Sequence, residues 1–318
     1  MSQEPATKSK NTGVWFAFGG LIVALAIAAI LIFNPFQKPS SSSISNTSSN
    51  TNQNNQNNQN TTPTTTKPNS SDPWQAQMDA PTRAILEKVV AAQGGLSALR
   101  KLKSMHWQGK TVTTYGTQII NSDTEEWIAL PARVRQTSNA SFVTGGKAVE
   151  TTIAVDTDHG WLRGPQEDAN KNLVEGIEDA TSGMISNALQ EITFDPLFSL
   201  LAVTESTVEF RYMGLQDVNG VQAHAISLST PFFGTGTFYY DPVTFLPIKL
   251  HREGGGLTVD RLFQKYQKVD GYQLPFLQNN HIKQVSTASS GEATSVTTYS
   301  TIEMNVPISD DLFVKPHS

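Results

Sequence analysis

Residues 261–278 read RLFQKYQKVDGYQLPFLQ, two strand-like runs separated by Asp270 and Gly271. An Asp-Gly pair suits a tight hairpin turn because both positions tolerate a positive φ. Asn219 and Gly220 stand between two further runs of the same kind. These stretches predict neighbouring strands that pair antiparallel.

Alternating polar and apolar residues predict strands in several places. In residues 208–212 (VEFRY) and 246–250 (LPIKL) every second side chain is apolar, which is the period of a strand with one face in water. The strand pattern begins near Met105, and a last strand is predicted near Thr297 to Val306. We expect a mainly β domain of the α+β class.

Two helical patterns come before the first strand. Pro81 is at a permissible first turn, and apolar residues recur at the spacing of one helical face between Ile85 and Val90. The Gly-Gly pair at 94–95 ends this helix, and residues 96–102 (LSALRKL) follow with a shorter helical pattern. The domain is therefore predicted to open with helices and then to change to strands.

The strand pattern is interrupted roughly from Glu178 to Leu201. Ile185, Leu189 and Ile192 keep helical spacing there, and residues 194–201 (FDPLFSLL) follow them. We interpret this segment as a helical insertion or a mobile apolar lid, and a packed helix is the alternative.

The strongest local signal is the run GVWFAFGGLIVALAIAAILIF, Gly13 to Phe33, which has no charged side chain. At about 1.5 Å per residue such a run reaches roughly 30 Å, the thickness of a bilayer core. A cleaved signal peptide is the alternative, but its apolar region needs only about 7–15 residues, and no small-residue cleavage site follows this run. We expect one retained transmembrane helix.

The flanking residues set the orientation of this helix. Lys8 and Lys10 precede it and Lys38 follows it, a slight positive bias on the N-terminal side. Residues 35–72 are almost entirely Ser, Thr, Asn, Gln and Pro, too poor in apolar groups to fold, and a plain cytoplasmic linker is the alternative to an external stalk. The predicted division is a cytoplasmic tail (1–12), the inner-membrane helix (13–34), a disordered linker (35–72) and one periplasmic β domain (73–318).

The composition excludes several classes of protein. Without cysteine the chain forms no disulfide, no thiolate metal site and no lipid-modified cysteine anchor. An extracytoplasmic eukaryotic domain usually carries disulfides, so the lack of cysteine favours a bacterial cell envelope. The formal net charge is -5, and the basic residues do not cluster with aromatic ones, so nucleic acid is not an expected partner.

Four motifs of the folded region carry a resemblance to a known superfamily. They are AAQGGLSALRKLKSMHWQGK (91–110), FYYDPVTFLPIKL (238–250), VDGYQLPF (269–276) and SDDLF (309–313). With this order of motifs, most of residues 80 to 315 resembles the periplasmic lipoprotein-carrier (LolA/LolB-like) proteins.

This resemblance implies a strongly curved antiparallel sheet, a half-barrel, with helices that close an apolar cavity. In the carrier proteins that cavity holds acyl chains. The present chain departs from the soluble carrier in keeping a helix and from the cysteine-anchored receptor in having no cysteine. A shuttle between membranes is therefore not expected, and no functional residue of the family is carried over to this chain.

Aromatic and aliphatic residues on the strands and in the lid segment are the candidates for a cavity lining. Burial of a ligand methylene contributes about 0.8 kcal/mol, so such a surface could hold a lipid tail. Ordinary core packing is the alternative for each residue taken alone. The candidate hydrophobic ligand-binding residues are Trp107, Trp127, Trp161, Phe194, Leu197, Phe198, Phe210, Phe238 and Tyr240.

No motif predicts an enzyme, a cofactor or a metal site. The six histidines are scattered, without HExxH spacing, and GxSxG is absent. The nearest cluster, Asp156, Asp158 and His159, is better explained by a hairpin turn. The Gly run at 254–256 is likewise interpreted as a hairpin connection.

Three functions follow from these expectations. The first is a membrane-anchored binding protein for a lipid, acyl chain or lipoprotein. The second is an envelope sensor or interaction module that uses the same fold to bind a protein partner. The third is a hydrolase or metal-dependent enzyme built on the Asp156 to His159 region. The first is preferred.

Overall fold

The computed structural model of the chain describes residues 78–142, 148–167, 173–204, 208–254, 257–285 and 290–317. The predicted tail, transmembrane helix and linker lie outside these residues. Among the helices of the described ranges, none combines the length and the apolar character needed to cross a membrane.

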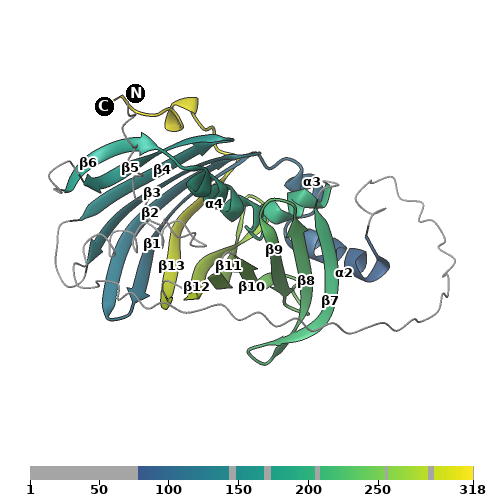
Figure 1. Cartoon of the computed structure of the whole chain (residues 1–318). Helices are drawn as coiled ribbons and strands as arrows, with labels where there is room; N and C mark the ends of the chain where they lie inside the picture. The colour runs from purple at the N-terminus through teal and green to yellow at the C-terminus, as the bar shows by residue number, and fades with distance from the viewer. Residues whose placement is uncertain are drawn as a thin grey trace, which may run out of the picture.

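One 13-stranded sheet makes up most of the described structure (Figure 1). Every hydrogen-bonded pair of neighbouring strands is antiparallel, which confirms the mainly β prediction. The strands are β1 (Ser104–Tyr115), β2 (Gln118–Ala129), β3 (Arg133–Phe142), β4 (Val149–Asp156), β5 (His159–Glu167), β6 (Leu173–Asp179), β7 (Glu209–Val218), β8 (Val221–Thr230), β9 (Gly234–Tyr240), β10 (Pro247–Gly254), β11 (Leu257–Val269), β12 (Tyr272–Val285) and β13 (Ser290–Met304).

The hairpin turns predicted at the Asn-Gly and Asp-Gly pairs are confirmed. Asn219 (φ 53°) and Gly220 (φ 87°) join β7 to β8, and Asp270 (φ 50°) and Gly271 (φ 97°) join β11 to β12. Gly254 lies opposite Leu257 in the β10–β11 pair, which confirms the third predicted hairpin. Local sequence therefore determines these connections.

The helices before the sheet begin as predicted, and the second is shorter. α2 (Ala80–Ala92) starts after Asp79, whose side chain accepts a hydrogen bond from the Thr82 amide. α3 (Leu96–Leu99) ends before Leu102, because the remaining residues form a turn with hydrogen bonds between residues three apart.

Two of the motifs behind the resemblance lie against each other. A Cβ atom at Gly94, between α2 and α3, would be 2.8 Å from the carbonyl oxygen of Gly271 in the β11–β12 turn. One residue later, the Tyr272 hydroxyl donates a hydrogen bond of 2.8 Å to the Ala98 carbonyl. The glycine at 94 thus permits the close approach that fixes the helices to the sheet.

The segment from Glu178 to Leu201 is helical only in part. α4 (Ser182–Thr193) is followed by the 3-10 helix η2 (Phe198–Thr204). Glu178 belongs to β6, where it pairs with Leu162, so the prediction placed the start of the helical segment too early. A last 3-10 helix, η3 (Asp310–Leu312), follows β13.

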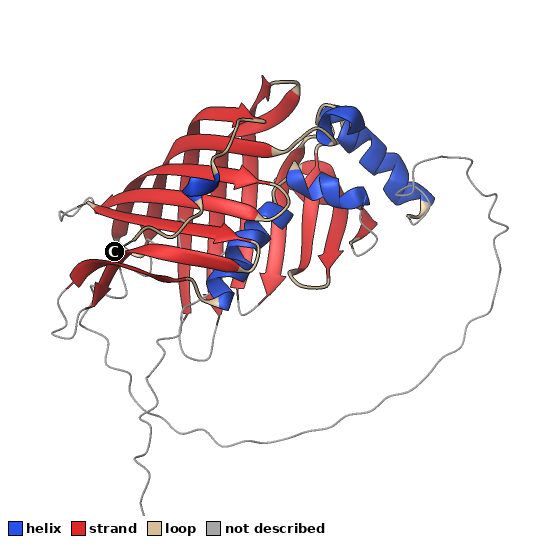
Figure 2. Ribbon diagram, turned by 90° about the horizontal axis from the view of Figure 1, so that it is seen from above, coloured by secondary structure: helices blue, strands red, loops and turns tan. Residues whose placement is uncertain are grey.

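The strand order dictates where α4 and η2 must lie. β6 and β7 follow each other in the chain but are the two edges of the sheet, in the order β6-β5-β4-β3-β2-β1-β13-β12-β11-β10-β9-β8-β7. Their connection must cross all the strands between them. Figures 1 and 2 show α4 and η2 on the side toward which the sheet curves, and we call residues 182–204 the crossing segment.

The outer face of the sheet carries a second, smaller core beneath the C-terminal residues. Trp161 and Ala154 pack there with Phe313, and the Trp161 indole donates a hydrogen bond of 2.9 Å to the Phe313 carbonyl. The guanidinium carbon of Arg133 lies 4.1 Å from the centroid of the Phe313 ring. The chain after β13 is therefore held to β3, β4 and β5 from outside.

Replacement of Phe313 by Ala is expected to lower the free energy of unfolding by about 3 kcal/mol, because a buried ring is removed from a small cluster that cannot collapse around the gap. Urea denaturation measures the change. V314A is the control, because Val314 is exposed and should leave the midpoint unchanged. Equal midpoints for F313A and the parent chain would contradict this packing.

Candidate functional site

A cavity of about 90 Å³ lies between the crossing segment and the concave face of the sheet. Its lining is mixed, so the structure does not show the purely apolar cavity that was expected. The apolar part of the lining includes Met105, Trp107, Ile128, Leu197, Leu274 and Ile302. The polar part includes Gln93, Thr111, Glu126, Gln136, Glu191, Asp195, Arg261, Asn280 and Thr297.

Polar contacts tie α4 to the far half of the sheet. The Arg261 guanidinium on β11 donates to Glu191 of α4 at 2.6 Å and to the Asn280 side chain at 2.7 Å. Arg252 on β10 donates to Gln190 of α4 at 2.9 Å. Both arginines are buried, and a buried guanidinium needs such partners because desolvation is costly.

Glu126 is a buried carboxyl without a paired cation. Burial, together with repulsion by Glu191, raises the pKa of Glu126 to about 8, although a hydrogen bond from the Trp107 indole acts in the opposite direction. In the described part of the chain, the arginine ion pairs in this region reach Glu191 and not Glu126. At neutral pH the Glu126 carboxyl therefore holds its proton.

Asp195 follows Phe194, the residue that caps the end of α4, and its side chain also lines the cavity. Its carboxylate accepts hydrogen bonds from the amides of Leu197 (2.8 Å) and Phe198 (3.0 Å), which starts the turn into η2. Burial raises the pKa of Asp195 to about 6 in spite of these two hydrogen bonds. The cavity thus holds two carboxyl groups that titrate near neutral pH.

The nine predicted ligand-binding residues fall into three groups. Trp107 and Leu197 line the cavity. A second group is buried in the adjoining core without lining the cavity, namely Phe194, Phe198, Phe210, Phe238 and Tyr240. Trp127 and Trp161 lie on the outer face. Trp127 stacks on His106 with 3.7 Å between the ring centroids, and Trp161 packs with Phe313. A role of any of them in ligand binding stays a prediction.

The sequence prediction missed the polar residues of the cavity. Glu126 has the same parity as the buried Ile120 and Ile128 of β2, and Arg261 has the parity of Val259 and Phe263 of β11. A charged residue in the apolar register of a strand points to the core, because alternate side chains share a face. This signal was present in the sequence.

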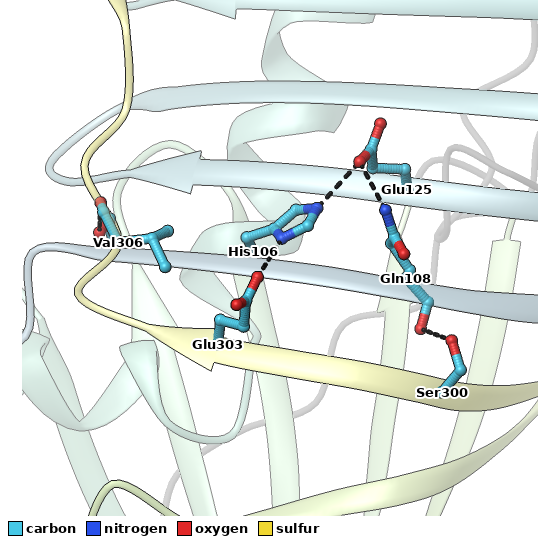
Figure 3. Close-up of polar contacts among 7 residues, drawn as sticks. His106, Gln108, Glu125, Ser300, Glu303 and Val306 are labelled. Carbon is cyan, nitrogen blue, oxygen red and sulfur yellow. Dashed lines mark hydrogen bonds and ion pairs between the residues drawn. The ribbon is translucent and has the colours of Figure 1, made fainter.

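The outer face carries a separate polar network around His106 (Figure 3). The His106 ring nitrogens lie 2.8 Å from Glu303 and 2.9 Å from Glu125, and Gln108 donates to Glu125 at 2.9 Å. Burial acts against ionisation of Glu125, but hydrogen bonds from Gln108 and His106 hold its pKa below the ordinary value. Each ring nitrogen has a protein partner, so the network joins β1, β2 and β13.

The cluster Asp156, Asp158 and His159 is a turn, as preferred from the sequence. Asp156 ends β4, His159 begins β5, and Thr157 between them has a φ of 62°. Within the described ranges, no group of three or more histidine or carboxylate residues is arranged to hold a metal ion.

Fold and site together define an open, curved antiparallel sheet with a helical segment across its concave face. No family model matches the sequence, and no curated protein matches it. Solved structures are similar to it. A DUF1329 family protein from Desulfovibrio piger has 10% identity and a TM-score of 0.45, over 74% of this chain and 98% of that one.

Two further solved structures are similar to this chain over most of their length. A LolA superfamily protein from Nitrosomonas europaea has 10% identity and a TM-score of 0.41, over 74% of this chain and 97% of that one. An outer membrane lipoprotein-sorting domain from Vibrio parahaemolyticus has 11% identity and a TM-score of 0.42, over 72% of this chain and 94% of that one. A LolA superfamily protein is thus among the solved structures that this chain resembles.

The buried proton of Glu126 determines the direction in which the free energy of unfolding changes with pH. The folded chain binds more protons than the unfolded chain between about pH 4.5 and 8, so the free energy of unfolding should fall as the pH rises through this window. E126Q removes this titration. We expect the free energy of unfolding of E126Q to fall less steeply with pH than that of the parent. At pH 8 the variant should be more stable than the parent by on the order of 2 kcal/mol.

Urea denaturation of both chains from pH 5 to pH 8 measures this difference. Burial raises the pKa of Asp195 only to about 6, so the free energy of unfolding of E126Q should still fall as the pH rises toward about 6. D123N is the matched control, since Asp123 is exposed on the same strand, and its profile should follow the parent chain. Parallel profiles for E126Q and the parent would rule out a buried proton on Glu126.

Proposed function

We propose that this chain is a binding protein that holds the apolar chain of a lipid or acylated ligand on its concave face, beneath the crossing segment. One observation carries the proposal. Much of the concave face is covered by the connection between the two edge strands, which places the apolar side chains of Phe194, Leu197, Phe198 and Leu200 in the core, while α2 and α3 contribute other side chains to the same core. A ligand chain could replace this cover without disturbing any strand pairing.

The size of the cavity requires such a replacement. Sites for whole small-molecule ligands measure about 300–1,000 Å³, whereas this cavity measures about 90 Å³. An acyl chain of roughly ten methylenes gains about 8 kcal/mol on burial, and the four apolar side chains of the cover lose about 1.5–3 kcal/mol each on exposure. The free energy gained by the acyl chain is therefore close to the free energy lost by the four side chains. The polar contacts of Arg261 and Arg252 with α4 then determine how readily the segment opens.

The proposal includes the membrane anchor. Residues 13–34 would span the inner membrane once, and residues 35–72 would tether the domain in the periplasm. The uncharged apolar run and the lack of cysteine support this arrangement. The protein would act as a receptor or holder near the membrane and not as an enzyme.

A protein partner is the second candidate ligand. Met213 and Leu215 on the edge strand β7 are 46% and 54% exposed. An edge strand with exposed apolar side chains is suited to pairing with a strand of another protein. Under this alternative the concave face would stay closed.

Gly236 offers a direct test of the cover. A Cβ atom at this position of β9 would be 2.7 Å from Cε1 of the fully buried Phe194 ring, so G236A should push the crossing segment away from the sheet. We expect a lower melting temperature and a several-fold increase in uptake of a fluorescent fatty acid. Uptake is measured by titration of the fluorescence.

G183A is the matched control for this experiment. Gly183 is exposed in α4, and an added Cβ atom would meet only the Thr181 hydroxyl, at 3.9 Å. Its uptake should equal that of the parent chain. If the parent, G236A and G183A all fail to take up both the fatty acid and a fluorescent alcohol of the same chain length, the binding proposal is wrong and the β7 edge becomes the preferred site.

A further inference from the structure

Three residues of the cavity stand in one row across the sheet. Trp107 of β1 pairs with Glu126 of β2, and Glu126 pairs with Gln136 of β3. Directly opposite residues on one face have Cβ atoms about 4.5–5.5 Å apart, so their side chains meet. The Trp107 indole donates to Glu126. The row therefore ends in two neighbouring acceptors, the carboxyl of Glu126 and the amide oxygen of Gln136.

Two amide oxygens in the cavity are buried without a partner. Gln136 and Gln93 line it and are only 5% and 1% exposed, and Oε1 of each has no hydrogen bond within the described structure. A buried acceptor left without a donor costs about 1–3 kcal/mol. The lining thus has an excess of acceptors, which calls for a ligand that brings donors.

The charges of the lining favour a cation over an anion. The lining includes three carboxyl groups, those of Glu126, Glu191 and Asp195, and one guanidinium, that of Arg261. Arg252 is not part of the lining, although it also pairs with Glu191. Arg261 already donates to Glu191 and to Asn280. An anionic ligand would meet three carboxyl groups, whereas a cationic one would meet unpartnered acceptors.

We infer that this cavity is the subsite for the ammonium group of an amine ligand, held by Glu126, Gln136 and Gln93. An ammonium group has three donors and no acceptor, which matches three acceptor side chains. The volume of about 90 Å³ exceeds the roughly 10–15 Å³ needed for one water, and it suits a head group and not a whole ligand. The inference rests on the proposed function for the apolar chain that would follow this group.

The same groups link binding to pH. Without a ligand the Glu126 carboxyl keeps its proton, because burial raises the pKa of this group to about 8. Ammonium binding needs the ionised carboxylate, so affinity should rise as the pH increases from 6 to 8. The charged groups that face Glu126 are Glu191 and Asp195 from the crossing segment and Arg261 from β11, and the Tyr299 hydroxyl of β13 keeps its proton because burial raises its pKa.

The test compares ligands with one chain and different head groups. Hexylamine, hexanoic acid and 1-hexanol are titrated into the full chain by calorimetry at pH 8, with the same detergent buffer as the blank. Ethylamine tests a head group with almost no chain. We expect hexylamine to bind at least about tenfold more tightly than the other hexyl compounds, since a hydrogen bond to a charged group is worth about 1.5–3 kcal/mol.

Variants assign the preference to the cavity. E126Q keeps the size of the side chain, and it should reduce hexylamine binding about tenfold and leave 1-hexanol binding unchanged. Q136L is a second variant that removes an unpartnered acceptor, and it should reduce hexylamine binding in the same direction. D123N, on the exposed side of the same strand as Glu126, should keep the preference of the parent chain.

The outcomes separate this inference from the proposed function. Equal binding of the three hexyl compounds would overturn the ammonium subsite and leave the chain-binding function intact. Preference for hexanoic acid would also overturn the subsite and would point to Arg261. Tight binding of ethylamine with no gain from the hexyl chain would support the subsite for a free amine and contradict the chain-binding function. No binding by any of the four would contradict both.

Discussion

The connection between β6 and β7 is the constraint on which the rest of the structure depends. These strands are consecutive in the chain but form opposite edges of a 13-stranded sheet, so the residues between them must cross the sheet on one face. The other neighbouring strands of the sheet are consecutive in the chain, except that β1 and β13 pair with each other in the middle of the sheet. Within the described chain, no other helical element contributes as many side chains to the core on this face. The crossing segment is therefore both part of the core and separable from the strand ladder.

The polar contacts under the crossing segment make its position specific. Glu191 lies between Arg252 and Arg261, and removal of one member of a buried ion pair leaves an uncompensated charge that costs about 3–5 kcal/mol. Apolar contacts alone would allow the segment to slide over the sheet. With this charge cluster, it has one closed position, and a ligand must compete with it there.

Period and turn chemistry allowed much of the fold to be predicted. The hairpins at Asn219 and at Asp270 follow from local φ preferences, and alternation identified the strands. The β1–β13 pairing could not be predicted, because alternation tells which face a residue occupies and not which strand lies beside it. Among the candidate site residues, Trp161 lies on the outer face and Glu126 on the inner one, and strand parity could have shown both. The position of Glu191 beside Glu126 could not be predicted, because it depends on where α4 packs on the sheet.

The most direct test of the account is hydrogen exchange of the full chain with and without a bound fatty acid, followed by mass spectrometry. If the crossing segment is the cover of the binding face, peptides from residues 182–204 should exchange faster with ligand, while those from β13 keep their protection. Binding that leaves residues 182–204 as protected as before, or more protected, would contradict a cover that a ligand displaces.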